Sequence, residues 1–307
     1  MRLEFADELV KLARSDSRVV LLTADLGFAV LEPFAAEFPD RFFNVGVAEQ
    51  NMIGLATGLA EAGLRPYAYS IATFASMRPY EFFRNGPALH ELPVRLIGMG
   101  GGLDYGHNGM THYALEDVAL MRVQPAVTIV APADAEQARA ALRATADHGG
   151  PVYFRLCKQS TPVSGLDGSF QLGRANVLQS GTDIAIVALG NLACAGLEAA
   201  GVLAEAGLSV AVVVVSCLNP SPVDDLADVL SQVPVAITAE AHYPNGGLGS
   251  LVCEVVAEHA LQCRVVRCAV PGPLRGITGS SDYLYEETGL TAEHIAGVGI
   301  ETLAAVA

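Results

Sequence analysis

The chain has 307 residues, of which 51% are hydrophobic and 17% charged, enough apolar side chains for two domains of ordinary size. Its formal net charge of −15 argues against nucleic-acid binding, which needs clustered Lys and Arg to neutralise phosphates. Apolar runs reach about eight residues, far short of the ~20 that a membrane-spanning helix needs. We therefore expect a globular protein with no nucleic-acid partner and no membrane segment.

The N-terminus and the cysteines indicate the compartment. Residues 1–16 (MRLEFADELVKLARSD) have the pattern of an amphipathic helix rather than of a signal peptide. The six cysteines form no CxxC motif, and most lie in apolar runs among Ala and Val. Buried thiols of this kind are typical of a reducing compartment, so we expect a cytoplasmic protein.

The first half of the chain alternates apolar runs with stretches rich in Ala, Leu and Glu. The apolar runs are continuous rather than alternating, which is typical of strands covered by helices on both faces. In chain order, the pattern predicts a helix over 1–16, a strand over 19–26, a helix over 48–63, strands over 94–100 and 127–132, a helix over 134–149 and a strand over 151–156.

The second half repeats this alternation. The predicted elements are a strand over 183–190, a helix over 193–207, strands over 209–216 and 234–240, a helix over 249–261 and a strand over 263–270. Alternating strands and helices predict parallel sheets with right-handed crossovers. Several of the helices are followed by Gly, a common helix stop.

A boundary is expected in residues 158–173, KQSTPVSGLDGSFQLG. This stretch is rich in Pro, Gly, Ser and Thr and has no long periodic apolar pattern. We therefore predict an α/β protein of two doubly wound domains with mostly parallel sheets. The first domain covers about 1–160 and the second about 174–307.

Glu49 is the first candidate for chemistry. In doubly wound sheets, ligands bind at the carboxyl ends of the strands. Glu49 lies in the first turn of a predicted helix, directly after Val45, Gly46, Val47 and Ala48. One interpretation is a carboxylate that only stabilises the helix dipole. The other is a carboxylate that faces an apolar cleft and shares a proton with a ligand.

A family resemblance favours the second interpretation. The string FFNVGVAEQNMIGLATGLAEAGLRPYAYSIATF (42–74) resembles the pyrimidine-binding region of transketolases, which carries G-x-x-E-Q, a long helix and then GLRPY. The strings TADL, LPVRLIG, GHNGMTHYALEDVALMR and VTIVAPAD occur in the family's order and spacing. The second domain, with EAHYPNGGLGS and GSSDYLYEETGLTAEHI, resembles the C-terminal transketolase domain. The match covers essentially the whole chain as the C-terminal half of a transketolase.

The resemblance implies a site for the pyrimidine ring of thiamine diphosphate. In the family the residue that matches Glu49 hydrogen-bonds a ring nitrogen of the aminopyrimidine and so assists loss of the cofactor's C2 proton. Phe74 matches the aromatic residue that stacks on the pyrimidine; without the resemblance, a core role is as good an interpretation. Relatives place further aromatics at the positions of Ile71 and Met77. Asp25 and Leu26 match an Asp-Leu pair beside the cofactor, although Asp25 also suits a helix cap.

The resemblance also implies residues that bind the substrate. His112, in the loop GHNGMTH, matches a histidine that donates to the substrate's oxygen, whereas a lone loop histidine is more often solvated. Asn108 stands where the family has an acid that contacts a substrate hydroxyl. Arg2 matches one phosphate-binding arginine, and Lys158 replaces a second, which loses the bidentate fork.

Two other contacts of the family are altered. The family serine site reads Gly27 to Val30 here, and a family histidine falls at about Gly100. We therefore expect an unusual donor or acceptor, including one without a terminal phosphate. Arg155 has two interpretations: it supplies a charge that replaces a missing substrate contact, or it is a surface residue of its strand.

The diphosphate and its Mg²⁺ are expected to bind elsewhere. The family holds both with a GDG…N segment, and no GDG occurs in this sequence. We predict no metal ligands in this chain and a partner subunit equivalent to the N-terminal half of a transketolase. The cofactor would lie between the subunits of an α₂β₂ assembly, with metal coordination mainly on the partner.

The expected reaction transfers a two-carbon ketol unit from a ketose to an aldose or other aldehyde. Two related chemistries stay open, those of 1-deoxyxylulose-5-phosphate synthase and of the β subunit of 2-oxo acid dehydrogenases. The latter usually has paired histidines where this chain has Thr111 and His112. A partner subunit that kept the fold and lost the chemistry is a third possibility, against which Glu49 argues.

Overall fold

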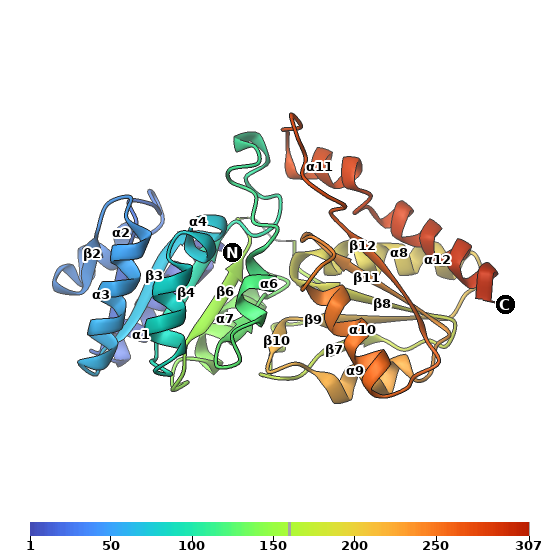
Figure 1. The fold of residues 1–307 in the computed structure, drawn as a ribbon, viewed down its shortest axis with the longest axis horizontal. Coiled ribbons are helices and arrows are strands. Elements are labelled where there is room, and N and C mark those ends of the chain that lie inside the picture. The colour runs from blue at the N-terminus through green and yellow to red at the C-terminus, as the bar shows by residue number, and fades with distance from the viewer. Residues whose placement is uncertain (159–160, 307) are drawn as a thin grey trace.

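The computed structural model describes residues 1–158 and 161–306. Its two sheets have seven and five strands, in the orders β10-β5-β6-β4-β3-β1-β2 and β12-β11-β8-β9-β7. Two of the strand pairs, β10 with β5 and β7 with β9, are antiparallel, and the other pairs are parallel. The predicted fold class is confirmed, and Figure 1 shows the two domains side by side.

The first domain contains six strands of its own and seven α-helices among the described residues. Its strands are β1 (Val19–Thr23), β2 (Phe42–Asn44), β3 (Arg65–Ile71), β4 (Arg95–Met99), β5 (Thr128–Val130) and β6 (Val152–Leu156). Its helices are α1 (Arg2–Ser15), α2 (Glu32–Glu37), α3 (Glu49–Glu61), α4 (Ala72–Met77), α5 (Tyr80–Phe83), α6 (Asp117–Arg122) and α7 (Ala135–Ala144). A π-helix, Arg84–Ala88, continues α5.

The second half of the chain forms the smaller sheet and one strand of the larger. Its strands are β7 (Asn176–Gln179), β8 (Ile184–Leu189), β9 (Val210–Val215), β10 (Cys217–Asn219), β11 (Val235–Glu240) and β12 (Arg264–Ala269). Its helices are α8 (Ala193–Glu205), α9 (Val223–Leu230), α10 (Leu248–Glu258), α11 (Ser281–Thr288) and α12 (Ala292–Val306).

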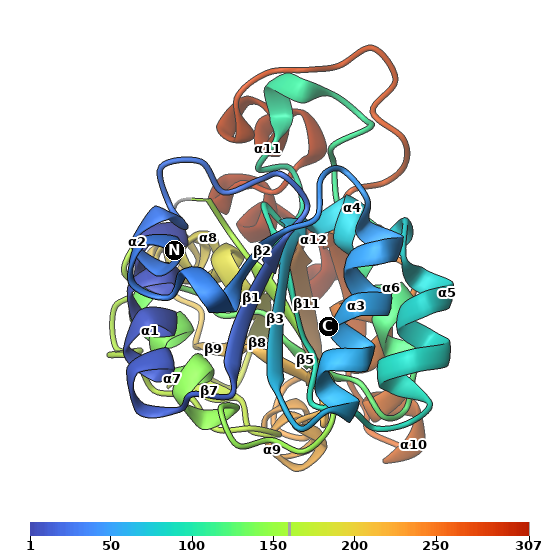
Figure 2. The ribbon, with the colours of Figure 1, turned by 90° about the vertical axis from the view of Figure 1, so that its left-hand side faces the viewer.

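Both faces of each sheet are covered. In β1, Leu21 packs in one hydrophobic cluster with α1 and α7, while Leu22 packs in another with α3. Figure 2 shows α1, α2 and α7 on one side of the first sheet and α3, α5 and α6 on the other. Burial on both faces explains why the strand runs are continuously apolar.

The two domains share structure. β10 leaves the second half of the chain and pairs antiparallel with β5 at the edge of the first sheet. One hydrophobic cluster contains Met52 of α3, Val118 of α6 and Val252 of α10, so it extends from one domain into the other. The predicted boundaries at 160 and 174 stay a prediction, and residues 160 and 307 lie outside the described part of the chain.

Two further observations concern the predictions about compartment. In the described ranges, no helix is both long and apolar enough to span a membrane. All six cysteines lie within these ranges, and none of them forms a disulfide there.

Candidate active site

The predicted site residues gather at the carboxyl ends of neighbouring parallel strands. The order β6-β4-β3-β1 within the first sheet places four strand ends next to one another. Lys158 follows β6, the loop from Gly100 to His112 follows β4, Phe74 follows β3 and Asp25 follows β1. Chain segments that are distant in sequence therefore meet at one edge, as parallel topology requires.

Glu49 is the buried acid of this edge. It is the first residue of α3, and only 2% of it is exposed. The hydroxyl of Ser70, near the end of β3, donates to Glu49 Oε1 at 3.2 Å. A buried carboxylate needs such donors, because loss of water is costly for a charge. The helix start and the strand end together fix the position of the carboxyl group.

Arg78 is the second partner of Glu49. Its Nη1 lies 2.9 Å from both carboxylate oxygens. The same guanidinium lies over the ring of Phe74, with Cζ 3.7 Å from the ring centroid. Phe74 is half-buried in α4, four residues before Arg78, so one turn of helix brings the two side chains together.

A line of contacts continues from Phe74 to Lys158. The rings of Phe74 and His112 meet edge to face at a centroid distance of 5.1 Å. His112 lies 6.1 Å from Tyr105 between ring centroids, and Lys158 Nζ lies 4.4 Å from the Tyr105 centroid. His112 Nδ1 also contacts Thr111 Oγ1 at 2.9 Å. The contacts thus connect Glu49 to Phe74 through Arg78, and Phe74 to Lys158 through His112 and Tyr105.

Tyr105 explains one departure from the family pattern. Gly100, where the family has a histidine, has φ +76°, and a Cβ there would overlap the Tyr105 ring. A histidine at this position is therefore incompatible with the observed loop.

Asp104 adds a carboxyl group to the same end of the site. Its Oδ2 accepts a hydrogen bond from the Lys158 backbone N–H at 2.6 Å. Burial raises the pKa of Asp104 to about 6, and the charges of Arg155 and Lys158 oppose this rise. A pocket of about 240 Å³ opens here, lined by Asp104, Gly106, His107, Lys158, Ser280, Ser281 and Asp282. The second domain therefore contributes polar groups to this end of the site.

Asp25 and Leu26 lie at a neighbouring pocket of about 210 Å³, which they line together with Asn44. Asn44 Nδ2 donates to Asp25 Oδ1 at 2.8 Å, and Asn44 Oδ1 accepts from the Gly46 N–H at 3.0 Å. Asp25 has φ 57° and is exposed, and its side chain caps no helix of the described chain. The pair lies beside the loop that leads into Glu49, with no direct contact to the carboxyl group.

The other predicted residues take varied positions. Ile71 is buried at the end of β3, and Met77 is partly exposed and accepts a weak contact from Thr73 Oγ1 at 3.9 Å. Asn108 is exposed in a short 3-10 helix.

Arg2 is half-buried, and its positive charge partly offsets the rise in the pKa of Tyr105 that burial causes. Arg2 and Lys158 thus act on the same tyrosine.

Arg155 is neither a surface residue nor a free charge, so neither interpretation of it from the sequence is correct. It is buried and donates from Nε to Asp117 Oδ2 at 2.8 Å. Its Nη2 donates to the carbonyl oxygens of Ala114 and Ala241. The guanidinium therefore ties the first domain to the second, and it cannot replace a substrate-binding arginine.

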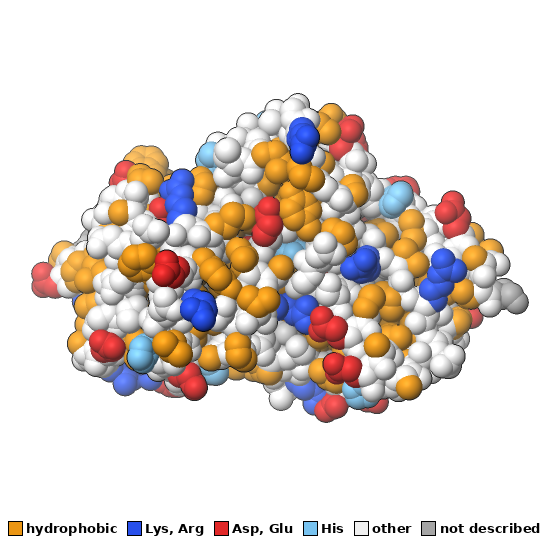
Figure 3. Space-filling model, viewed as in Figure 1, with side chains coloured by type: hydrophobic (Ala, Val, Ile, Leu, Met, Phe, Trp, Pro, Cys, Tyr) orange, Lys and Arg blue, Asp and Glu red, His pale blue; other side chains and the backbone are white. Residues whose placement is uncertain are grey.

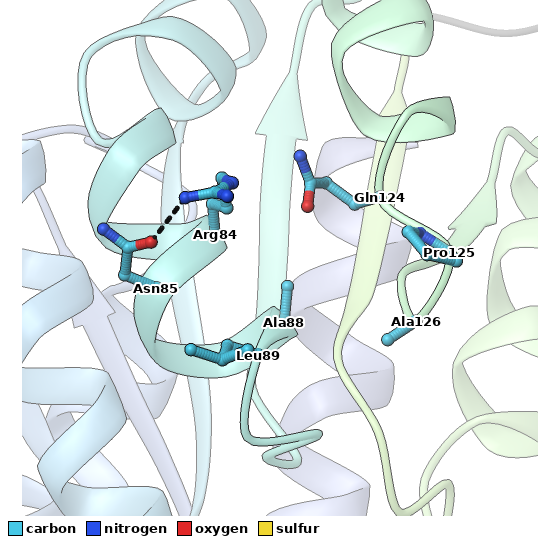
Figure 4. A pocket seen from close by; sticks show the side chains of 7 residues that line it. All are labelled: Arg84, Asn85, Ala88, Leu89, Gln124, Pro125 and Ala126. Carbon is cyan, nitrogen blue, oxygen red and sulfur yellow. Dashed lines mark hydrogen bonds between the residues drawn. The ribbon is translucent and has the colours of Figure 1, made fainter.

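A separate pocket of about 220 Å³ lies away from these residues. Arg84, Asn85, Ala88 and Leu89 line one side and Gln124, Pro125 and Ala126 the other. Arg84 donates to Asn85 Oδ1 at 2.8 Å on the same side of the pocket, as the dashed line in Figure 4 marks. It shares no lining residue with the cluster around Glu49, so we assign it no part in the chemistry.

Three residues of the site, Arg78, Tyr105 and Asp104, were not predicted from the sequence. Arg78 carries a signal, because it stands four residues after Phe74 on a helical segment. Tyr105 and Asp104 carry none, because their positions depend on how the glycine-rich loop after β4 folds back on itself.

Comparison with protein families matches both domains. Residues 1–164 match the transketolase pyrimidine-binding domain, and residues 173–295 match the transketolase C-terminal domain. A putative transketolase C-terminal section of Methanocaldococcus jannaschii is 35% identical over 300 residues, which are 96% of this chain and 94% of that protein. An apulose-4-phosphate transketolase subunit of Phocaeicola vulgatus is 33% identical, over 98% of this chain and 96% of that protein.

Solved structures agree with these matches. A split-gene transketolase, described as an inactive beta4 tetramer, superposes with a TM-score of 0.90 at 36% identity and covers 100% of this chain and 99% of that one. The transketolase of Leishmania mexicana gives a TM-score of 0.82 at 22% identity, over 99% of this chain and 45% of that one, which shows a shared fold. The chain therefore belongs to the transketolase family and carries its pyrimidine-binding and C-terminal domains.

Proposed function

We propose that this chain is the β-type subunit of a split, thiamine-diphosphate-dependent transketolase. The observation that supports this most directly is the buried carboxyl group of Glu49, which Arg78 links to the aromatic face of Phe74. A flat aminopyrimidine needs a ring to stack on and an acid at its nitrogen, and Phe74 and Glu49 supply both. The residues present therefore fit the pyrimidine half of the cofactor.

Each residue has a role in this proposal. Thiamine diphosphate, when bound, supplies the carbon nucleophile that takes up the two-carbon unit. Glu49 holds the proton that it shares with the pyrimidine nitrogen, and Ser70 keeps its carboxyl group oriented. Phe74 positions the ring. His112, in contact with Phe74, donates a hydrogen bond to the substrate's oxygen.

A partner subunit is part of the proposal, because this sequence has no GDG segment for the diphosphate and Mg²⁺. Exposed apolar side chains occur on the segments that carry or adjoin the site residues, and we call them the apolar rim: Phe28 after β1, Val47 just before α3, Leu55 in α3, Met77 in α4 and Phe82 in α5. Val47 is 70% exposed although it lies two residues before the buried Glu49. Figure 3 shows apolar side chains over the domain that carries α3 and α5. Such a surface suits a subunit interface, and we propose that an N-terminal-half subunit covers it in an α₂β₂ assembly.

The substrate end of the site combines opposite charges. Arg2 and Lys158 lie near Tyr105, and Asp104 lies beside Lys158. We propose that this end binds the far end of a ketose or aldose. An ionised Asp104 disfavours a phosphate there, which supports an unusual substrate, including one without a terminal phosphate. The free cysteines support a cytoplasmic location for the enzyme.

One related chemistry has an observation in its favour. The 1-deoxy-D-xylulose-5-phosphate synthase of Symbiobacterium thermophilum is 35% identical over 95% of this chain, which spans 45% of that longer protein. Carboligation with a 2-oxo acid donor is therefore the alternative reaction for the same site.

The test begins with the neighbouring genes. We expect one of them to encode a chain with a GDG…N segment. The two chains are purified together, given thiamine diphosphate and Mg²⁺, and assayed with phosphorylated and unphosphorylated ketoses and with pyruvate, each with an aldehyde acceptor. Ketol transfer from a ketose supports the proposal. Turnover with pyruvate as donor but with none of the ketoses supports the alternative. Failure of the assembled pair to bind the cofactor would contradict both.

A further inference from the structure

The guanidinium of Arg78 takes the place that the proposed function gives to the aminopyrimidine. It donates to both oxygens of Glu49 at 2.9 Å and covers the face of Phe74 at 3.7 Å. A guanidinium is planar, stacks on aromatic rings and donates N–H groups to carboxylates. An aminopyrimidine has the same three properties. The two groups therefore compete for one acid and one ring face.

The chemistry of proton sharing also requires Arg78 to leave. Arginine stays protonated in proteins, so it stabilises the ionised carboxylate and cannot exchange a proton with it. A ring nitrogen can exchange one. Ser70, the other donor to Glu49, has a neutral hydroxyl and can remain. Only the Arg78 contact conflicts with the role of Glu49.

Arg78 is placed so that it can move. Its side chain is 42% exposed, and the residue directly follows α4. Within the described chain, its side chain makes hydrogen bonds only to Glu49. Rotation into solvent would therefore break the ion pair and the stacking on Phe74 and no other polar contact.

We propose that Arg78 is an internal ligand of the cofactor site, which holds Glu49 and Phe74 in place and which the aminopyrimidine displaces. This rests on the proposed function. While Arg78 contacts Glu49, both carboxylate oxygens have hydrogen-bond donors, from Arg78 and Ser70. The cofactor can bind only to molecules in which this contact is broken. The measured dissociation constant is therefore the intrinsic one divided by the fraction of molecules with the contact broken. A charge-assisted hydrogen bond of ordinary strength makes this factor about ten or more.

The test measures the affinity of the assembled two-chain enzyme for thiamine diphosphate by isothermal titration calorimetry, with Mg²⁺ present. We expect Arg78→Ala to bind the cofactor about tenfold or more tightly than the natural chain. Arg78→Lys, which keeps the charge and loses the planar stack, should fall between the two. Arg78→Gln serves as a second variant in case alanine disturbs α4. Arg14→Ala, which removes an exposed arginine paired with Glu37, is the matched control and should change nothing.

A double-mutant cycle shows whether the effect acts through Glu49. In a chain that carries Glu49→Ala, the further change Arg78→Ala should tighten binding much less than it does in the natural chain, because the ion pair is already lost and only the stacking on Phe74 remains. Unchanged or weaker binding by both Arg78→Ala and Arg78→Gln, in an intact complex, would overturn the inference. If the natural complex binds no thiamine diphosphate, the proposed function fails instead, so the two failures are distinct.

Discussion

At the scale of single residues, Asp104 is a buried carboxyl group whose charge changes near neutral pH. Burial raises the pKa of its carboxyl from 3.8 to about 6. The groups that interact electrostatically with it are the Lys158 side chain and backbone N–H, the Arg155 guanidinium, the N-terminal amine, Tyr105, Cys157 and Tyr285, and His107 and Asp282 line the same pocket. Below about pH 6 the carboxyl is neutral, and above it the carboxylate repels an anionic substrate.

This titration predicts a pH-dependent preference among substrates. A sulfonate-ended ketose keeps a constant charge across this range, whereas the second pKa of a phosphate is itself about 6. The KM of a sulfonate-ended ketose, relative to that of a hydroxyl-ended one, should rise by roughly fivefold from pH 5 to pH 7.5, the effect of about 1 kcal/mol of repulsion.

Asp104→Asn supplies the comparison for this prediction. The amide can still accept the hydrogen bond from the Lys158 N–H, but it does not titrate, so the KM ratio should stay flat with pH. An equal rise in the variant would show that another group is responsible.

The limits of sequence reasoning are plain at this scale. Glu49, Phe74, His112 and Lys158 could be proposed from the sequence because each falls at a position of the family pattern that the sequence resembles. The ion pair of Glu49 with Arg78 could not, because it depends on how the start of α3 faces the end of α4. The burial of Arg155 could not be predicted either, because its partner Asp117 is 38 residues away.

At the scale of elements, the eight predicted strands all exist, each within one to three residues of its predicted ends. Four strands, β2, β3, β7 and β10, were not predicted. β3 (RPYAYSI) contains Pro and small residues and lies hidden within the motif that follows α3. β2 and β10 have three residues each, too few for a periodic pattern, and β10 exists only because it pairs with β5 of the other domain.

The ion pair between β6 and α6 predicts a large effect on stability. Arg155 and Asp117 are both buried, and Asp117 Oδ1 has no hydrogen-bond partner among the described residues. Arg155→Met should lower the free energy of unfolding by about 3–5 kcal/mol, because it leaves a buried carboxylate unpaired. The midpoint of urea denaturation, followed by circular dichroism, measures the change.

A compensating double variant and a control variant show whether the loss comes from the buried charge. The double variant Arg155→Met, Asp117→Asn removes both charges and should recover much of the loss. Arg14→Ala breaks an exposed pair with Glu37 and should cost at most about 1 kcal/mol. If Arg155→Met were no more destabilising than Arg14→Ala, the buried pair would not contribute to the stability of the fold.

At the scale of the whole molecule, the two halves of the chain form one structural unit. The sheets share an apolar cluster, β10 crosses to the first sheet, and the loop after β4 rises beside α11 (Figure 1). The hydroxyl of Tyr113 in that loop donates to the carbonyl oxygen of Ile277 at 3.0 Å. The apolar rim lies on the loop after β1 and on the segments from Val47 to Phe82, in the half of the chain that carries Glu49.

The apolar rim predicts where the partner binds. Val47→Asp places a charge on an exposed side chain, so the fold should be unaffected, while burial of that charge in an interface should weaken association by about tenfold or more. Analytical ultracentrifugation of the mixed chains measures it. Val177→Asp on β7 introduces the same charge at a valine that is 46% exposed and lies in the second domain, away from the rim, and should leave association unchanged. Equal weakening by both variants, or by neither, would place the interface elsewhere.

The central claim is that the carboxyl group of Glu49 shares a proton with the pyrimidine of the cofactor. The most direct test is the rate at which the C2 proton of thiamine diphosphate exchanges with deuterium in the assembled two-chain enzyme. Glu49→Gln keeps the size and the hydrogen bond but cannot exchange a proton, so the rate should fall by about 100-fold or more at equal cofactor occupancy. An unchanged exchange rate in Glu49→Gln, with the cofactor bound, would contradict the claim.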